Sequence, residues 1–134
     1  LGLDLSVIAT PLSPRLTTSL AYQYLDAREL KTDTSPQRPL LFRPRHLFTL
    51  SADYAIDRVS VGADFRYSSR YERGDPLFDD TRFNARVLDL RAGWTTGPLD
   101  VRVKLANVLN YIYNLAPRTL EPVRTLTLVA TYAR

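Results

Sequence analysis

Apolar and polar residues alternate along most of the chain. Between residues 59 and 68, every second position holds an apolar side chain, namely Val59, Val61, Ala63, Phe65 and Tyr67, and polar residues or glycine fill the positions between them. Successive side chains of a β-strand point to opposite faces, so this period of two predicts a strand with one apolar and one polar face. No stretch of useful length repeats its apolar residues at helical spacing. The chain is therefore predicted to be all-β.

The same alternation recurs along the rest of the chain. In one such segment, Leu88, Leu90 and Trp94 alternate with Asp89 and Arg91. The pattern predicts seven strands, at residues 3–10, 16–28, 46–56, 59–71, 85–95, 99–109 and 123–133. Their order along the chain and the short turns between some of them predict an antiparallel up-and-down meander.

The predicted connections alternate in length. Tight turns are expected at 11–14, 57–58 and 96–98, whereas 29–45, 72–84 and 110–122 are long polar stretches. In an up-and-down meander all the tight turns then lie at one end of the strands and all the long connections at the other. This asymmetry, with strands of about ten residues or more against a usual 5 to 6, is typical of outer-membrane barrels.

The aromatic residues of the apolar face are predicted to gather near the two ends of the strands. Tyr54, Trp94 and Tyr132 lie near the tight turns. A larger group lies toward the long connections: Tyr22, Tyr24, Phe48, Phe65, Tyr67 and Tyr71. Two aromatic bands around an aliphatic belt are what the two interfaces of a bilayer favour. The alternative interpretation is that these residues form the core of a soluble β-sandwich, although sandwich strands are shorter.

Composition narrows the chemistry that the chain can perform. Its 134 residues carry 18 Lys and Arg against 14 Asp and Glu, a net charge of +4, and contain no Cys and one His. The basic residues are scattered among acidic ones, so we expect no nucleic-acid binding. The absence of cysteine excludes disulfides and thiolate sites within these residues. No nucleophile or carboxylate is predicted beside His46, which is interpreted as an interfacial residue at the start of a strand.

We therefore expect no enzymatic activity, no cofactor and no metal site. The one acidic cluster that could attract a hard cation, Asp75, Asp79 and Asp80, lacks EF-hand spacing and lies among arginines, so it is interpreted as a solvated loop.

Seven strands do not form a closed bacterial barrel, because those barrels have even strand numbers. An open sheet in lipid would leave backbone groups at both edges without hydrogen bonds, at a cost of several kcal/mol each. The chain also begins at Leu1, with neither a start Met nor a signal-peptide pattern. We expect it to be a fragment, a truncated form or a separate subunit of a larger barrel.

Four stretches, in order and at suitable spacing, resemble the C-terminal β-barrel portion of TonB-dependent outer-membrane receptors. Gly-Leu-Asp-Leu-Ser at 2–6 is similar to a strand that follows an extracellular loop, and Phe-Arg-Pro-Arg-His at 42–46 to the start of a late strand. Leu-Ala-Asn-Val-Leu-Asn-Tyr at 105–111, followed by Tyr113, resembles the family's signature at the end of the penultimate strand. Leu-Glu-Pro-Val-Arg at 120–124 is similar to the approach to its final strand.

The resemblance implies that residues 1–134 form about seven strands of a transmembrane barrel of about 22 strands, without the plug domain. It also implies a location in the outer membrane of a Gram-negative bacterium. The function implied is import of a scarce nutrient such as an iron chelate, a cobalamin-like compound or an oligosaccharide. The partners would be the lipid bilayer, the remaining strands and plug, TonB acting through the plug, and the small nutrient.

The polar faces of the predicted strands carry a set of charged side chains that would point into the lumen. Asp89 is expected opposite or diagonal to Lys104, within reach across the strands in either register. These residues are interpreted either as a contact surface for the plug or substrate, or as a hydrated wall whose charges compensate one another. They are Asp53, Asp64, Arg66, Asp89, Arg91, Arg102 and Lys104.

Two other classes of protein fit the alternation. The chain could be a structural subunit of a larger membrane assembly, in which other polypeptides would pair with its first and last strands. It could also be a soluble β-sandwich or a ligand-binding barrel, which would be monomeric without detergent.

Overall fold

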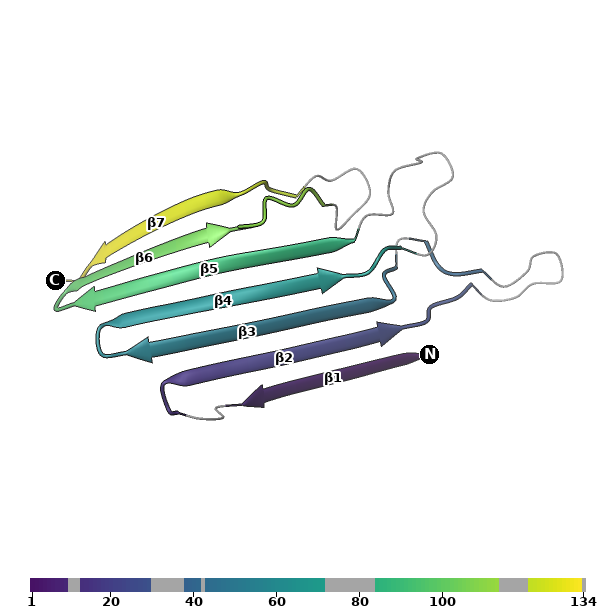
Figure 1. Cartoon of the computed structure of the whole chain (residues 1–134), viewed down its shortest axis with the longest axis horizontal. Helices are drawn as coiled ribbons and strands as arrows, with labels where there is room; N and C mark the ends of the chain where they lie inside the picture. The colour runs from purple at the N-terminus through teal and green to yellow at the C-terminus, as the bar shows by residue number, and fades with distance from the viewer. Residues whose placement is uncertain (10–12, 30–37, 42, 72–83, 114–120, 134) are drawn as a thin grey trace.

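The computed structural model describes residues 1–9, 13–29, 38–41, 43–71, 84–113 and 121–133. Within these ranges the secondary structure consists of seven strands (Figure 1): β1 (Gly2–Ala9), β2 (Leu16–Leu25), β3 (His46–Ile56), β4 (Val59–Ser68), β5 (Ala85–Thr96), β6 (Leu99–Ala106) and β7 (Thr125–Tyr132). The described part of the chain has no helix that is long and apolar enough to cross a membrane.

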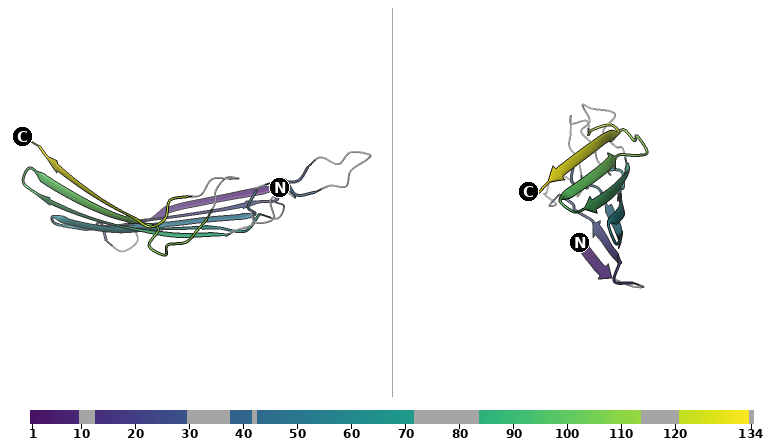
Figure 2. Two further views of the ribbon diagram at one scale, coloured as in Figure 1. Left: turned by 90° about the horizontal axis from the view of Figure 1, so that it is seen from above. Right: turned by 90° about the vertical axis from the view of Figure 1, so that its left-hand side faces the viewer.

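The strands form one antiparallel sheet in the order β1-β2-β3-β4-β5-β6-β7, so every strand pairs with its neighbours in sequence. The predicted all-β meander is therefore confirmed. Figure 2 shows the seven described strands as a single curved layer.

Across the middle of the sheet, the register places apolar side chains on one face and most of the charged side chains on the other. On one face, Leu20, Leu50, Phe65 and Leu88 stand in one row from β2 to β5. On the opposite face, a row from β3 to β6 contains Asp53, Gly62, Arg91 and Lys104. We call these the apolar face and the charged face.

The turns between β3 and β4 and between β5 and β6 lie at one end of the sheet, and the strand ends that lead into the long connections lie at the other, as predicted (Figure 1). Asp57, in the turn between β3 and β4, has φ of 49°, and Gly97, between β5 and β6, has φ of 54°. Two-residue hairpin turns require such positive φ angles, which glycine adopts at low cost and aspartate adopts more readily than most residues. Asp57 and Gly97 are therefore suited to the positive φ angles of these two tight turns.

Three strands that run toward the long connections end three residues earlier than predicted. These are β2, β4 and β6, and the strands β1, β6 and β7, of eight residues each, are shorter than the ten or more expected. Beyond β2 and β4, the described residues form two isolated bridges, between Arg28 and Pro39 and between Pro44 and Tyr71. Proline has no backbone N–H for a ladder, so the chain supports single contacts there but no regular pairing.

The apolar face is exposed along its length. Val61 in the centre of the sheet is 48% exposed, Trp94 is 45% exposed, and Leu128 on β7 is 68% exposed. The buried hydrophobic cluster of the described residues lies elsewhere and is small, consisting of Ala85, Val87 and Tyr113. None of the described strand residues on this face is fully buried, and many are largely exposed.

Candidate functional site on the charged face

The seven charged residues predicted to share one face do so, and six of them are connected by ion pairs within the sheet. Arg91 of β5 reaches across β4 to Asp53 of β3, with Nη2–Oδ2 and Nε–Oδ1 distances of 2.6 and 2.8 Å. Gly62 lies between them in the same row, and a Cβ there would overlap both side chains. The glycine therefore provides the space in which this bidentate pair forms.

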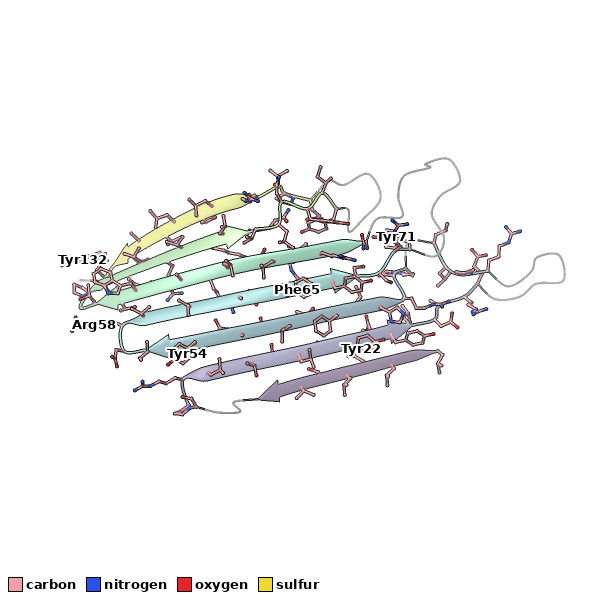
Figure 3. All side chains as sticks on the ribbon, viewed as in Figure 1. Tyr22, Tyr54, Arg58, Phe65, Tyr71 and Tyr132 are labelled. Atoms are coloured by element: carbon pink, nitrogen blue, oxygen red, sulfur yellow. The ribbon has the colours of Figure 1, made fainter. Side chains whose placement is uncertain are left out.

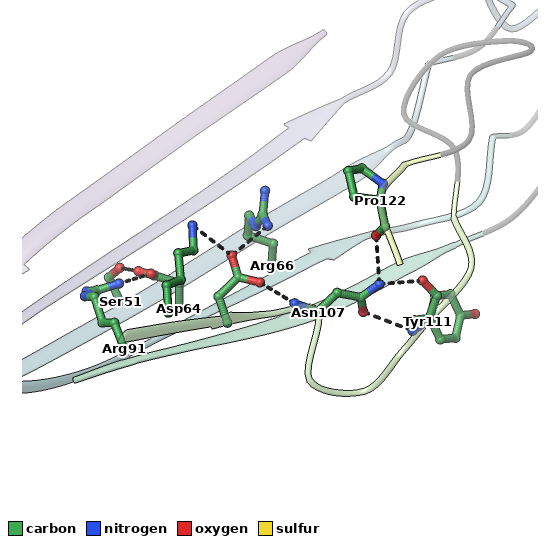
Figure 4. Close-up of polar contacts among 9 residues, drawn as sticks. Ser51, Asp64, Arg66, Arg91, Asn107, Tyr111 and Pro122 are labelled. Atoms are coloured by element: carbon green, nitrogen blue, oxygen red, sulfur yellow. Dashed lines mark hydrogen bonds and ion pairs between the residues drawn. The ribbon is translucent and has the colours of Figure 1, made fainter. Parts of the chain in front are cut away.

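Asp64 connects the same arginine to β3. It accepts hydrogen bonds from the Arg91 guanidinium and from the Ser51 hydroxyl (Figure 4). Asp64 stands directly opposite Asp89 in the register, so two carboxylates face each other across β4 and β5. The cations around them offset a repulsion that would otherwise destabilise this pairing.

Asp89 is the most buried charged group of the face, with its side chain 8% exposed. Its Oδ2 lies 3.1 Å from Arg66 Nη2 and 3.7 Å from Lys104 Nζ. Its Oδ1 accepts a hydrogen bond of 2.8 Å from the backbone N–H of Asn107. Because Lys104 is paired with Arg91 in the register, Asp89 meets Lys104 diagonally, one of the two arrangements predicted. A carboxylate buried to this extent is stable only with such partners.

Asn107 folds the chain that follows β6 back over the charged face. Its φ is 50°, and it is 3% exposed. Its side-chain Nδ2 donates to the carbonyls of Tyr111 and Pro122 at 2.9 and 3.2 Å, and its Oδ1 accepts from the Tyr111 N–H at 2.9 Å (Figure 4). We call residues 107–113 the ledge.

The ledge covers the part of β5 nearest the long connections. Ala85 and Val87, both on the charged face, are buried together with Tyr113, and Tyr111 packs against this cluster. The Tyr111 hydroxyl donates to Asn84 Oδ1 at 2.6 Å. Burial raises the pKa of the Tyr113 phenol above its ordinary value, and the carboxylates of Glu121 and Asp89 act in the same direction while Arg66 opposes them. The sheet is thus thickened by the ledge at one end of the charged face.

Arg102 is the predicted site residue that lies apart from the network. Its Nε pairs at 2.7 Å with Asp100 Oδ1 on the same strand, and Asp100 also accepts from the Thr95 hydroxyl at 2.9 Å. The Arg102 side chain is 74% exposed. This pair lies toward the tight turns, where a shallow hollow on the charged face includes Arg91, Arg102 and Lys104 among its lining residues.

Four participants were missed in the sequence. Ser51 and Asp100 occupy charged-face positions in the same alternation, so the pattern could have included them. Gly62 and Asn107 carry no such signal, because one acts through the absence of a side chain and the other through a backbone turn beyond the end of a strand. Such roles depend on neighbours that only the register brings together.

Most aromatic residues of the apolar face stand near its two ends, but Phe65 stands one row further in, with Leu50 and Leu88. Figure 3 shows Tyr54 and Tyr132 toward the tight turns and Tyr22 toward the long connections. The Tyr22 hydroxyl lies 2.8 Å from His46 Nδ1, and the Tyr24 and His46 rings are 5.3 Å apart. In the register, Tyr22, Phe48 and Tyr67 form one row.

Tyr71 differs from the sequence-based expectation for the aromatic band. It lies beyond the end of β4 and is 7% exposed. Burial raises the pKa of its phenol. An aromatic residue of the exposed apolar face would have remained accessible, so Tyr71 does not belong to that band.

No group of three or more His, Cys, Asp or Glu among the described residues has the arrangement of a metal site. Asp75, Asp79 and Asp80, weighed above as ligands for a hard cation, lie outside the described residues. The charged face can therefore be characterised as a set of mutually paired side chains with a thickened margin. Such a surface can bind a polar or charged partner by exchanging some of these pairs.

No protein-family model matches the sequence, and no curated protein matches it.

Proposed function

We propose that this chain forms part of the wall of a transmembrane β-barrel in the bacterial outer membrane, as the C-terminal barrel portion of a TonB-dependent receptor. The observation that carries the proposal is the exposed apolar face of a single-layered sheet, with aromatic residues near both ends. Removing apolar surface from water contributes about 25 cal/mol per Å², so a face of this size needs an apolar environment. Lipid supplies that environment.

The dimensions of the apolar face support lipid over a second layer of protein. On β5, Trp94 lies eight positions after Arg86. At about 3.4 Å per residue and a tilt of about 40°, this stretch spans roughly 21 Å across a bilayer, close to the apolar band of about 25 Å in such barrels. Arg86 stands beside Tyr67 and is the one Arg, Lys, Asp or Glu on the apolar face of the described strands. An arginine at the margin lies at the level of polar headgroups, whereas one in a sandwich core would be buried.

The remaining features of the sheet follow from the same proposal. The charged face is the lumen wall, where water and the plug solvate or pair its side chains. The outer edges of β1 and β7 pair with further strands, since lipid cannot satisfy their backbone groups. The same two edges would also serve a structural subunit that completes a barrel with other polypeptides.

The transport activity rests on the family resemblance. By that resemblance, the barrel encloses a plug, the long connections at 29–45, 72–84 and 110–122 help to capture a scarce nutrient outside the cell, and TonB transmits energy from the inner membrane to the plug. The wall is a scaffold in this process and catalyses no reaction. The nutrient would be an iron chelate, a cobalamin-like compound or an oligosaccharide.

Cell fractionation combined with nutrient uptake tests this proposal. We expect the complete protein in the outer-membrane fraction and its deletion to abolish uptake of one nutrient at low concentration. Dissipating the proton gradient of the inner membrane should stop that uptake while leaving binding at the cell surface intact. Recovery of the protein in the soluble fraction would contradict the membrane assignment. An outer-membrane protein whose deletion changes no energy-dependent uptake would contradict the receptor assignment and favour the structural subunit.

A further inference from the structure

A hollow lies on the charged face beside the ledge. Its floor consists of two rows of the sheet, one containing Leu47, Ser68 and Ala85 and the other Thr49, Arg66 and Val87. Tyr113 of the ledge stands at its border, so the hollow has a wall that the sheet alone would not provide. The volume of this open hollow is about 180 Å³.

The lining of this hollow breaks the alternation of the chain. Leu47 is an apolar residue at a charged-face position and is 37% exposed. Ala85 and Val87 also break the pattern, but the ledge buries them. Leu47 therefore adds exposed apolar surface to the charged face at the place where the hollow forms. Concave sites with apolar walls and a few polar groups are typical of ligand-binding sites.

Arg66 provides the polar group of the hollow. Its Nη2 donates to Asp89, and this is its one hydrogen bond within the described part of the chain. The guanidinium has five N–H donors in a planar fork, so most of them can serve another acceptor. The Arg66 side chain is 47% exposed and that of Asp89 only 8%. A molecule entering the hollow thus meets the cation and not the carboxylate paired with it.

We propose that this hollow is a binding subsite for a small, flat, apolar group that carries a carboxylate. The apolar part would lie among Leu47, Val87 and Tyr113, and the carboxylate would accept hydrogen bonds from Arg66, as arginine forks favour. The volume suits one ring, since an engineered apolar cavity of roughly 150 Å³ binds benzene. The subsite would bind one part of a larger ligand, because whole ligand sites are typically larger than the hollow.

This inference deepens the proposed function and rests on it only for the role of the subsite in transport. If the charged face is the lumen wall, a ligand entering from the side of the long connections would reach the ledge early. Binding of the isolated group does not depend on that orientation. The binding test can therefore give a negative result although the chain lies in a membrane. Binding can also be observed although the membrane assignment is wrong.

Fluorine NMR of fluorobenzoate, with the complete protein purified in detergent, tests the subsite. Fluorobenzamide is a neutral probe of the same shape. We expect saturable broadening of the fluorobenzoate signal and at least about tenfold weaker binding of fluorobenzamide, because the charge-assisted hydrogen bonds to Arg66 are lost. Empty detergent micelles give the background for partitioning.

Two variants and one control decide the result. Arg66→Gln should weaken fluorobenzoate binding about tenfold or more and change fluorobenzamide binding little, whereas Ser68→Leu fills the floor and should abolish binding of both probes. Arg58→Gln removes an equal charge at the turn between β3 and β4 and should change neither. The gel-filtration elution volume, which does not depend on charge, must stay unchanged in every variant that is compared. No saturable binding, or equal binding by wild type, Arg66→Gln and Ser68→Leu, would overturn the proposal.

Discussion

At the scale of single residues, two of the paired carboxylates on the charged face, Asp53 and Asp89, differ in burial. Asp53 binds Arg91 but its side chain is 53% exposed, whereas that of Asp89 is 8% exposed and holds two cations and a backbone N–H. Exposed ion pairs contribute about 0–1 kcal/mol, and removing one partner of a buried pair costs about 3–5 kcal/mol. We expect Asp89→Ala to lower the free energy of unfolding by about 3 kcal/mol and Asp53→Ala by less than about 1 kcal/mol. Urea unfolding of the complete protein measures both.

The neutral variant Asp89→Asn separates the contribution of the carboxylate charge from that of the hydrogen bond that Asp89 accepts from the Asn107 N–H. It keeps an acceptor for the Asn107 N–H but loses the charge that faces Arg66 and Lys104. Its cost should lie between those of the two alanine variants. Equal costs for Asp89→Ala and Asp53→Ala would mean that Asp89 is not a buried anchor of the ledge.

The Tyr113 phenol makes the ledge sensitive to alkaline pH. Burial raises its pKa above the ordinary value of 10.0, so the folded ledge favours the neutral phenol. The resulting stabilisation is fully present below the pKa of the unfolded chain and is lost as the pH rises through the raised pKa of the folded protein. Burial raises the pKa of Tyr71 too, so phenolate absorbance should show two late-titrating groups. Tyr113→Phe should remove one of them, and the variant should be less sensitive to high pH. Titration of this group together with exposed tyrosines would contradict the burial of Tyr113.

The alternation in the sequence was sufficient to place all seven predicted charges on one face, because side-chain direction in a strand depends only on position. It could not identify Gly62, whose role depends on Asp53 and Arg91 in the two neighbouring strands. It also could not reveal the ledge, because the conformation of Asn107 and its hydrogen bond to Asp89 involve a turn outside any regular pattern.

At the scale of strands, the sequence predicted every strand and its neighbours, and the errors concern strand ends. The prediction for β6 extended to residue 109 because Val108 and Leu109 continue an apolar segment, whereas the strand ends at Ala106. At the next residue the backbone adopts a positive φ and its N–H turns to Asp89. The hydrophobic pattern indicates which residues avoid water. A strand, however, ends where its backbone groups form hydrogen bonds with groups outside the sheet.

Opposite faces of one strand should respond oppositely to a charge. Leu128 and Thr127 are neighbours on β7, with Leu128 paired to Val103 on the apolar face and Thr127 to Lys104 on the charged face. Arginine on the lipid side of a barrel costs about 2–4 kcal/mol at mid-bilayer, while arginine in the lumen is hydrated. Leu128→Arg should therefore lower the free energy of unfolding in vesicles by this amount and Thr127→Arg by less than about 1 kcal/mol. Leu90→Arg, on β5, repeats the test, and equal tolerance on both faces would refute the assignment.

At the scale of the whole molecule, seven strands leave two open edges. β1 and β7 both run from the long connections toward the tight turns, so joining them directly would require a parallel seam in an antiparallel sheet (Figure 1). We expect residues 1–134 alone to associate through these edges in detergent, because exposed strand edges pair with other chains. Light scattering measures the mass. A monodisperse monomer would show that the chain satisfies its own edges and would favour an independent domain.

The central claim is that the apolar face contacts lipid, and spin-label accessibility along β5 tests it most directly. The 134 residues contain no cysteine, so single cysteines at positions 88–92 can each carry a nitroxide, with the unsubstituted complete protein as background. Oxygen concentrates in lipid and a nickel chelate stays in water. Positions 88, 90 and 92 should be accessible to oxygen and protected from nickel, whereas 89 and 91 should lack this lipid signature. Nickel access at 88, 90 and 92, or protection of these positions from both reagents, would contradict the claim.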